Sequence, residues 1–176
     1  WSPDTREWNR VCPGTPLIPN GEQQGDYDWG TVYGGLAPVV LENEIRLYYG
    51  GCDGLHFGHR KGCFCLAGLR PDGFAGYEQH VAERPATVTT SLVECAGQDL
   101  RINADLAEGG YLSVRLMDDN GESLAVSEPV YATLTEAKLR WRENKTLDIF
   151  AGARLHLRFE FRGARVYSFC FTNAER

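Results

Sequence analysis

The feature that most constrains the fold is a strict two-residue alternation near the end of the chain. Between Leu155 and Phe161 (LHLRFEF) every apolar residue falls on one side of an extended chain and every polar residue on the other. A period of two is that of a half-buried β-strand and not of an amphipathic helix. The stretch therefore predicts a strand with one face on a core and the other in water.

Several other segments between residues 81 and 176 have the same character. Strand-like runs occur at 101–104, 111–117, 138–141, 154–162 and 165–171, and Asp118-Asp119-Asn120-Gly121 is typical of a hairpin turn. The stretch 146–150 is interpreted as one helical turn or as a loop, and no segment predicts a long helix. Short alternating segments with turns at this spacing predict an antiparallel β-sandwich. Its arginines are expected to form a solvated outer face, and Trp141 to lie in a core or between domains.

Residues 1–80 also predict strands rather than helices. Two apolar segments, 36–41 and 45–49, are separated by the polar turn Glu42-Asn43-Glu44, which is typical of a β-hairpin. The apolar run Gly62–Leu69 (GCFCLAGL) predicts a well-buried strand. The chain is thus expected to be all-β, with one domain over 1–80 and a second over 81–176.

Charge and hydropathy exclude two classes of partner. The net charge of −6 disfavours a general nucleic-acid binder, which needs clustered lysine and arginine. No apolar run is long enough to span a membrane. The only methionine is Met117 and the chain opens on Trp1, so we expect a fragment or a processed product, and the cellular location stays open.

Cysteine and histidine spacing does not predict a metal site. The six cysteines include no C-x-x-C pair, and His56 and His59 have no obvious third ligand nearby. Cys63 and Cys65 would project from the same face of a strand, too close together for a disulfide of normal geometry. We expect most cysteines to be free, buried thiols, with a Cys12–Cys52 disulfide as the alternative, and no cofactor.

The most function-like cluster precedes the hairpin, at Asp26-Tyr27-Asp28-Trp29. Two carboxylates at i and i+2 of an extended segment point the same way, and close like charges push their pKa values apart, as in an acid/base pair. The alternative is a solvated loop with an Asx-turn. Asp28 is the first candidate for a catalytic carboxylate and Asp26 the second.

A second group of candidates surrounds the hairpin and would bind substrate. Glycines at 50, 51 and 54 permit close approach of a ligand, and nearby aromatic, carboxylate and basic side chains can stack on or hydrogen-bond to sugars. The candidate substrate-binding residues are Trp29, Tyr33, Asp53, His56, His59 and Arg60.

Four sequence motifs occur in an order that resembles a known architecture. They are Trp1-Ser2-Pro3-Asp4 with Trp8, Gly25-Asp26-Tyr27-Asp28, Arg46-Leu47-Tyr48-Tyr49-Gly50-Gly51, and Leu69-Arg70-Pro71-Asp72-Gly73-Phe74. Together they resemble the last blade region of five-bladed β-propeller glycoside hydrolases, the β-fructosidases (invertase and levanase) and their arabinosidase and xylosidase relatives. The rest of the chain resembles the β-sandwich that often follows such a propeller.

This resemblance implies a carbohydrate-active protein whose catalysis depends on residues outside the chain. It implies that Trp8 packs between blades and that the Asp26–Asp28 loop reaches the rim of the central funnel. Such enzymes use two carboxyl groups that flank the glycosidic bond. No counterpart of the family's nucleophile motif is present, and Glu94-Cys95 lies outside the propeller-like segment, so it does not supply the acid. We expect this chain alone to hydrolyse sugars poorly or not at all.

Two alternatives to the glycosidase-related hypothesis remain. One is a non-catalytic carbohydrate-binding or structural β-module. The other is a small standalone enzyme that uses Asp26, Asp28 and His56. A lone blade region leaves apolar surface and strand edges uncovered, so residues 1–80 are expected either to pack on their own sandwich or to associate with another copy through those edges.

Overall fold

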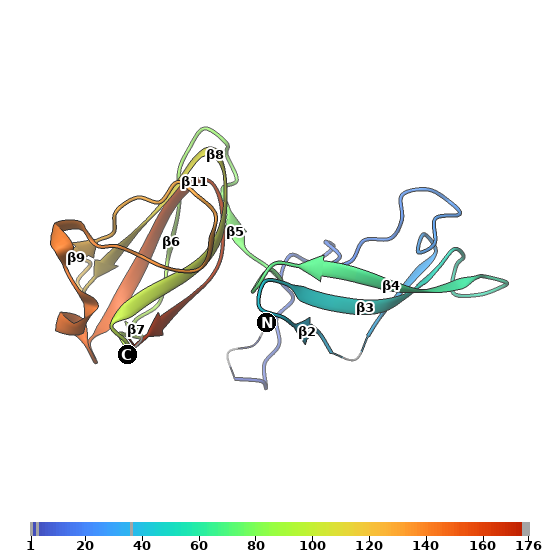
Figure 1. The fold of residues 1–176 in the computed structure, drawn as a ribbon, viewed down its shortest axis with the longest axis horizontal. Helices are drawn as coiled ribbons and strands as arrows, with labels where there is room; N and C mark the ends of the chain where they lie inside the picture. The colour runs from blue at the N-terminus through green and yellow to red at the C-terminus, as the bar shows by residue number, and fades with distance from the viewer. Residues whose placement is uncertain (1, 3, 36, 174–176) are drawn as a thin grey trace. The chain divides into compact units, whose positions relative to one another are not determined.

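The computed structural model describes residues 2, 4–35 and 37–173, which form two compact units that divide between Ala75 and Gly76. The chain is all-β, as predicted, and its sheets are antiparallel. The elements are β1 (Thr31–Gly34), β2 (Val39–Val40), β3 (Ile45–Cys52), β4 (Gly62–Leu69), β5 (Tyr77–Glu78), β6 (Ala86–Thr89), β7 (Val93–Glu94), β8 (Asp99–Met117), β9 (Ser123–Val126), β10 (Leu134–Lys138), the 3₁₀ turns η1 (Arg142–Asn144) and η2 (Leu147–Phe150), and β11 (Arg154–Thr172) (Figure 1).

The first unit is built on β3. One edge of β3 pairs along its full length with β4, and the other pairs with β2 at one end and β1 at the other. The predicted hairpin is present, with the Leu41 N–H donating to the carbonyl of Glu44 over 2.9 Å. Its first strand is shorter than predicted, because only Val39 and Val40 pair with β3.

The two faces of this sheet differ in burial. Ile45, Tyr49 and Cys65 are buried on one face. On the other face Phe64 is 82% exposed and Leu66 52% exposed. The prediction that Gly62–Leu69 is a strand is confirmed, but the prediction that it is well buried is wrong. β4 pairs only with β3, and although Cys52 on this second face is buried, Phe64 and Leu66 of β4 lie open.

The segment before β1 consists of turns and bends. Trp8 is 71% exposed, and its indole N–H donates to the carbonyl of Thr5. In the described chain Trp8 is therefore a surface residue and not the packed residue that the resemblance implied, because no neighbouring sheet is present to cover it.

All six cysteines are free. Cys52, Cys65 and Cys95 are buried, whereas Cys12, Cys63 and Cys170 are exposed. The prediction that the cysteines are free thiols is confirmed at all six positions. The prediction that they are buried is confirmed at three of the six. Cys12 and Cys52 do not form the alternative disulfide.

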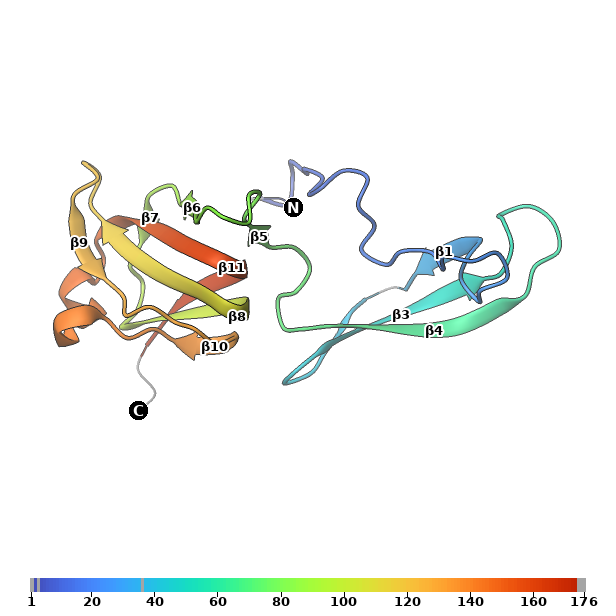
Figure 2. The ribbon, with the colours of Figure 1, turned by 90° about the horizontal axis from the view of Figure 1, so that it is seen from above.

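The second unit is built on two long strands, β8 and β11, which pair antiparallel along almost their whole length and curve together (Figures 1 and 2). The segments predicted at 154–162 and 165–171 are one strand, bent at Gly163. Likewise 101–104 and 111–117 belong to one strand, which bends near Gly110. A Cβ on Gly110 would lie 2.4 Å from the carbonyl oxygen of Gly163, so the bend requires glycine at this contact.

One face of this bent sheet encloses a single core. Leu100 and Ile102 from one half of β8 and Leu112 and Leu116 from the other are completely buried in the same cluster. The remaining strands extend the two halves, with β10 and β5 on one and β9, β6 and β7 on the other. The two layers of the predicted sandwich are thus halves of one seven-stranded sheet. Trp141 is 7% exposed and packs in this core.

Smaller features of the second unit also follow the sequence. The turn at Asp118–Gly121 joins β8 to β9, and Asp118 Oδ1 accepts the N–H groups of Asn120 and Glu122. Residues 147–150 form a single 3₁₀ turn, one of the two alternatives. Among the described residues, no helix is both long and apolar enough to cross a membrane.

Candidate functional site

Two loops meet at one end of the first sheet, one before β1 and one after β3. The N–H of Gly30 donates to the carbonyl of Cys52 over 2.9 Å, and Thr31 Oγ1 donates to the carbonyl of Gly54 over 3.0 Å. A Cβ on Gly30 would lie 2.0 Å from the carbonyl of Gly54, so only glycine permits this approach. These contacts hold together the two loops that carry most of the predicted site residues.

Asp26 and Asp28 lie together around Gly21. A Cβ on Gly21 would be 2.9 Å from Asp26 Oδ2 and 2.9 Å from Asp28 Oδ1. The segment is turned and not extended, since the N–H of Trp29 donates to the carbonyl of Asp26. The two carboxylates nevertheless lie near each other, because the turn brings both side chains to the same glycine.

Asp28 is an internal residue of this loop. It is 6% exposed, and its Oδ2 accepts a hydrogen bond from Tyr49 Oη over 2.7 Å. Burial raises the pKa of Tyr49 far above its ordinary value, and the hydrogen bond with Asp28 adds to the rise. The Tyr49 phenol therefore remains a proton donor to Asp28, and the pair fixes the loop on β3.

Tyr33, His56 and Arg60 form a separate cluster with exposed polar atoms. Tyr33 Oη and His56 Nδ1 are 2.7 Å apart, and Arg60 Nη2 donates to Tyr33 Oη over 3.5 Å. Arg60 Nη1 donates to the carbonyls of Leu55 and His56, which closes the loop after β3 on itself. Sequence spacing alone does not reveal this cluster, because Tyr33 comes from β1, on the other side of the hairpin.

The carboxylate group and the Tyr33 group lie on opposite faces of the sheet. A Cβ on Gly51 would be 2.8 Å from Cβ of Asp28, whereas a Cβ on Gly50 would be 3.8 Å from Cβ of Tyr33. Successive residues of a strand point to opposite faces. The structure therefore brings Asp26 together with Asp28, and Tyr33 together with His56 and Arg60, but it does not combine the two groups.

The remaining predicted residues support the loops or lie at their surface. Asp53 Oδ1 accepts the N–H of Lys61 over 2.7 Å, and the Asp53 N–H donates to the Lys61 carbonyl. Trp29 is half-buried, and its carbonyl accepts a hydrogen bond from Asn20 Nδ2. His59 is exposed. Within residues 2, 4–35 and 37–173, no three His, Cys, Asp or Glu side chains gather in a way that could hold a metal ion.

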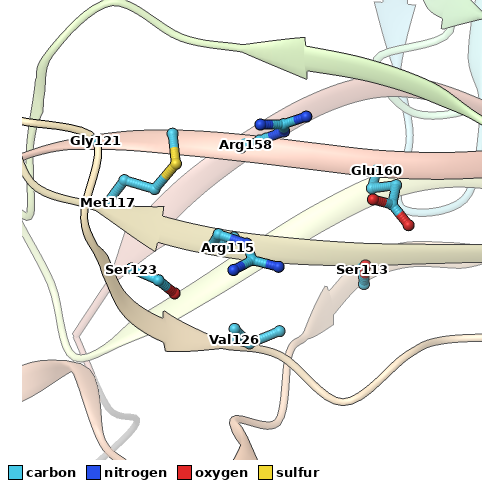
Figure 3. A pocket seen from close by; sticks show the side chains of 8 residues that line it. All are labelled: Ser113, Arg115, Met117, Gly121, Ser123, Val126, Arg158 and Glu160. Carbon is cyan, nitrogen blue, oxygen red and sulfur yellow. The ribbon is translucent and has the colours of Figure 1, made fainter.

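A concavity also lies elsewhere, on the outer face of β8, β9 and β11, where the sequence predicts only a solvated surface. It has a volume of about 340 Å³ and is shown in Figure 3. Its lining residues are Ser113, Arg115, Met117, Gly121, Ser123, Val126, Arg158 and Glu160. Alternation places Arg115 and Arg158 on polar faces, but only the strand register sets them opposite each other.

Comparison with known proteins assigns no family. Neither the protein-family models nor the curated proteins include a match to this chain.

Proposed function

We propose that this chain is a carbohydrate-binding part of a glycoside hydrolase-related protein, of the β-fructosidase or arabinosidase and xylosidase type. The observation that carries the proposal is the exposed Tyr33–His56–Arg60 cluster. It offers a phenol, an imidazole and a guanidinium within hydrogen-bonding reach of one another. Such a mixed set of donors and acceptors can bind the neighbouring hydroxyl groups of a sugar.

An aromatic ring stands beside these polar groups. Phe57 is 90% exposed, and its ring meets the His56 ring edge-on with the centroids 5.0 Å apart. An exposed ring can pack against the apolar face of a sugar while the polar groups bind its hydroxyls. This combination favours oligosaccharide binding at the loop end of the sheet.

The same geometry favours binding over hydrolysis. Hydrolysis needs two carboxyl groups that flank the scissile bond. Asp28 is buried against Tyr49, and both Asp28 and Asp26 lie apart from the exposed cluster. The standalone-enzyme alternative requires Asp28 and His56 in one site, so it has no geometric support.

The blade assignment rests on the motif resemblance and gains indirect support from the sheet. Propeller blades are four-stranded antiparallel sheets whose faces pack on neighbouring blades. The four strands of the first unit are antiparallel, although β1 and β2 share one edge of β3 and the sheet is three strands wide. Its more exposed face carries Tyr48 stacked on Phe64, with ring centroids 5.4 Å apart. A neighbouring sheet would bury this pair. The second unit would then be the accessory β-sandwich.

The test is calorimetric titration of the chain with fructo-, arabino- and xylo-oligosaccharides. We expect binding of at least one series, weakened about tenfold by His56→Ala or Arg60→Gln through loss of hydrogen bonds. His80→Ala and Arg84→Gln, at exposed positions of the second unit, are the matched controls. Absence of binding to all three series, or equal effects of the control variants, would refute the proposal.

Hydrolysis assays complete the test. We expect no turnover of sucrose, inulin or aryl arabinosides and xylosides. Turnover that Asp28→Ala abolishes would instead make the Asp26–Asp28 loop an active site.

The second candidate function is a structural module for assembly. It is favoured by the uncovered Tyr48–Phe64 pair and the free edge of β4. Self-association without any sugar binding would select this function over the first.

A further inference from the structure

We propose that the outer face of β8 and β11 carries a binding site for an acidic saccharide, a sugar bearing a carboxylate or a sulfate ester, centred on Arg115 and Arg158. The oxyanion part of the inference rests on the second unit alone. The choice of a saccharide as the carrier of the anion rests on the proposed function.

The first observation is the register of the strands. Arg115 of β8 lies directly opposite Arg158 of β11, and both side chains belong to the exposed face. Like charges at directly opposed positions of an antiparallel pair destabilise the sheet. Two arginines at opposed positions concentrate positive charge on this part of the face.

The second observation is that neither arginine is neutralised by an ion pair. On its other side Arg158 faces Thr89, and Arg115 faces Val126. Within the described part of the chain, neither guanidinium takes part in an ion pair or hydrogen bond.

Other arginines of β11 are placed differently. Arg154 lies opposite Glu94, and Arg165 forms an ion pair with Glu78. The Arg115–Arg158 pair is therefore not the general pattern of this surface.

The third observation is the shape and composition of the concavity over this pair. The strand segments leave a hollow of about 340 Å³, which is at the small end of ligand pockets. Ser113 and Ser123 contribute hydroxyl groups, while Met117 and Val126 contribute an apolar side (Figure 3). Hydroxyls and an apolar wall beside a cationic centre match a sugar ring that bears one acidic group.

Glu160 narrows the choice of anion. Its carboxylate lines the same hollow, and Tyr111 Oη donates to its Oε1 over 3.1 Å. A carboxylate beside two guanidiniums reduces the net positive charge and can accept a sugar hydroxyl. The site should therefore prefer a monoanion, such as a uronate or a sulfate monoester, over a phosphate monoester, whose charge near neutral pH is about −1.5 to −2. Guanidinium forks bind both planar carboxylates and sulfate-like oxyanions through paired hydrogen bonds.

The test is calorimetric titration of the whole chain with methyl glucuronide, glucose monosulfate and neutral methyl glucoside. We expect one or both acidic sugars to bind, in a salt-dependent manner, and the neutral sugar not to bind. Arg115→Gln and Arg158→Gln should each weaken binding about tenfold or more. Arg158→Lys should weaken it too, because an ammonium keeps the charge but lacks the fork.

The matched control is Arg154→Gln, on the same face of the same strand, which should leave binding unchanged. Thermal unfolding separates binding from structure. Because Arg158→Gln relieves repulsion, its unfolding midpoint should stay the same or rise. A clear fall would assign the arginine a structural role and overturn the proposal, as would equal losses in Arg154→Gln and Arg158→Gln or the failure of both acidic sugars to bind.

Failure of this inference can be told apart from failure of the proposed function. His56→Ala should leave acidic-sugar binding intact, because His56 belongs to the first unit. Binding of neutral oligosaccharides through His56 with no response to either acidic sugar would overturn only the arginine site. The reverse pattern would overturn only the loop site.

Discussion

At the scale of single residues, the Asp28–Tyr49 contact links the site loop to the sheet. A carboxylate that is 6% exposed depends on its hydrogen bonds, because burial removes most of its water. Tyr49 supplies one of these bonds from β3. Gly21 and Gly51 pack directly against Asp28, since a Cβ on either glycine would lie within 3 Å of an Asp28 atom. Because of its contact with Tyr49, Asp28 has a structural role in the described chain rather than an exposed carboxylate available for catalysis.

Tyr49→Phe should destabilise the first unit. The variant keeps the ring but leaves the buried Asp28 oxygen without its donor, which costs about 1–3 kcal/mol. Chemical denaturation measures the change, and Tyr131→Phe, at a residue that is 69% exposed, is the control. Equal stability of the two variants would show that the Asp28–Tyr49 bond contributes nothing.

The same phenol predicts a loss of stability at alkaline pH. The pKa of Tyr49 is raised in the folded chain, first by burial and then by Asp28, so the folded state holds its proton more tightly than the unfolded state. This contribution is fully present below about pH 10, the ordinary pKa of tyrosine, and is lost as pH rises from there through the folded-state value. Burial also raises the pKa of Tyr111 and Tyr167.

Ultraviolet titration of tyrosinate should therefore show a group of tyrosines that ionises only above the ordinary range. Tyr49→Phe should remove part of that group and reduce the dependence of the unfolding free energy on alkaline pH. A titration in which every tyrosine ionises at its ordinary pKa would contradict the folded-state environment of Tyr49.

At the scale of elements, the burial of β4 differs most from what the sequence predicts. The apolar run Gly62–Leu69 predicts a strand, and the strand has those bounds. The apolar run does not predict how far the strand is buried. An apolar strand has the same sequence pattern whether or not a second layer of structure covers it. Here β4 is an edge strand with no charged residue and an exposed face.

An uncharged edge strand of this length is expected to pair with β4 of a second copy. Light scattering should show association that increases with concentration. Leu66→Lys should reduce it by placing a charge on the edge strand, whereas Ile149→Lys, at an exposed position in η2, should not. A wild-type chain that stays monomeric at high concentration would contradict this prediction.

At the scale of the whole molecule, the chain contains two compact units with separate sheets. The predicted boundary was 80/81, whereas the units divide at 75/76, since Tyr77 and Glu78 pair with β11. A two-residue strand leaves no sequence pattern that would mark it. The second unit holds the large core, and the first has few fully buried side chains.

Calorimetry of the whole chain should therefore resolve two unfolding transitions. Leu157→Ala, at a completely buried core position, should destabilise the second unit by about 2–5 kcal/mol. It should leave the transition of the first unit in place. A single transition that shifts as a whole would mean that the units unfold together.

The sequence by itself determined the all-β class, the hairpin around Glu42–Glu44, the turn at Asp118–Gly121 and the inward residues of 155–161, because periodicity and turn chemistry are local properties. It also predicted Asp26 beside Asp28, but from an extended segment, whereas a turn brings the two side chains to the same glycine. Tertiary structure decided what depends on pairing between distant segments. The bulges near Gly163 and after Val166 change which residues face inward, so Phe169 and Phe171 pack against the core and Cys170 does not. Strand register likewise set Tyr33 beside His56 and Arg115 opposite Arg158, since a shift of one residue would turn each side chain to the other face.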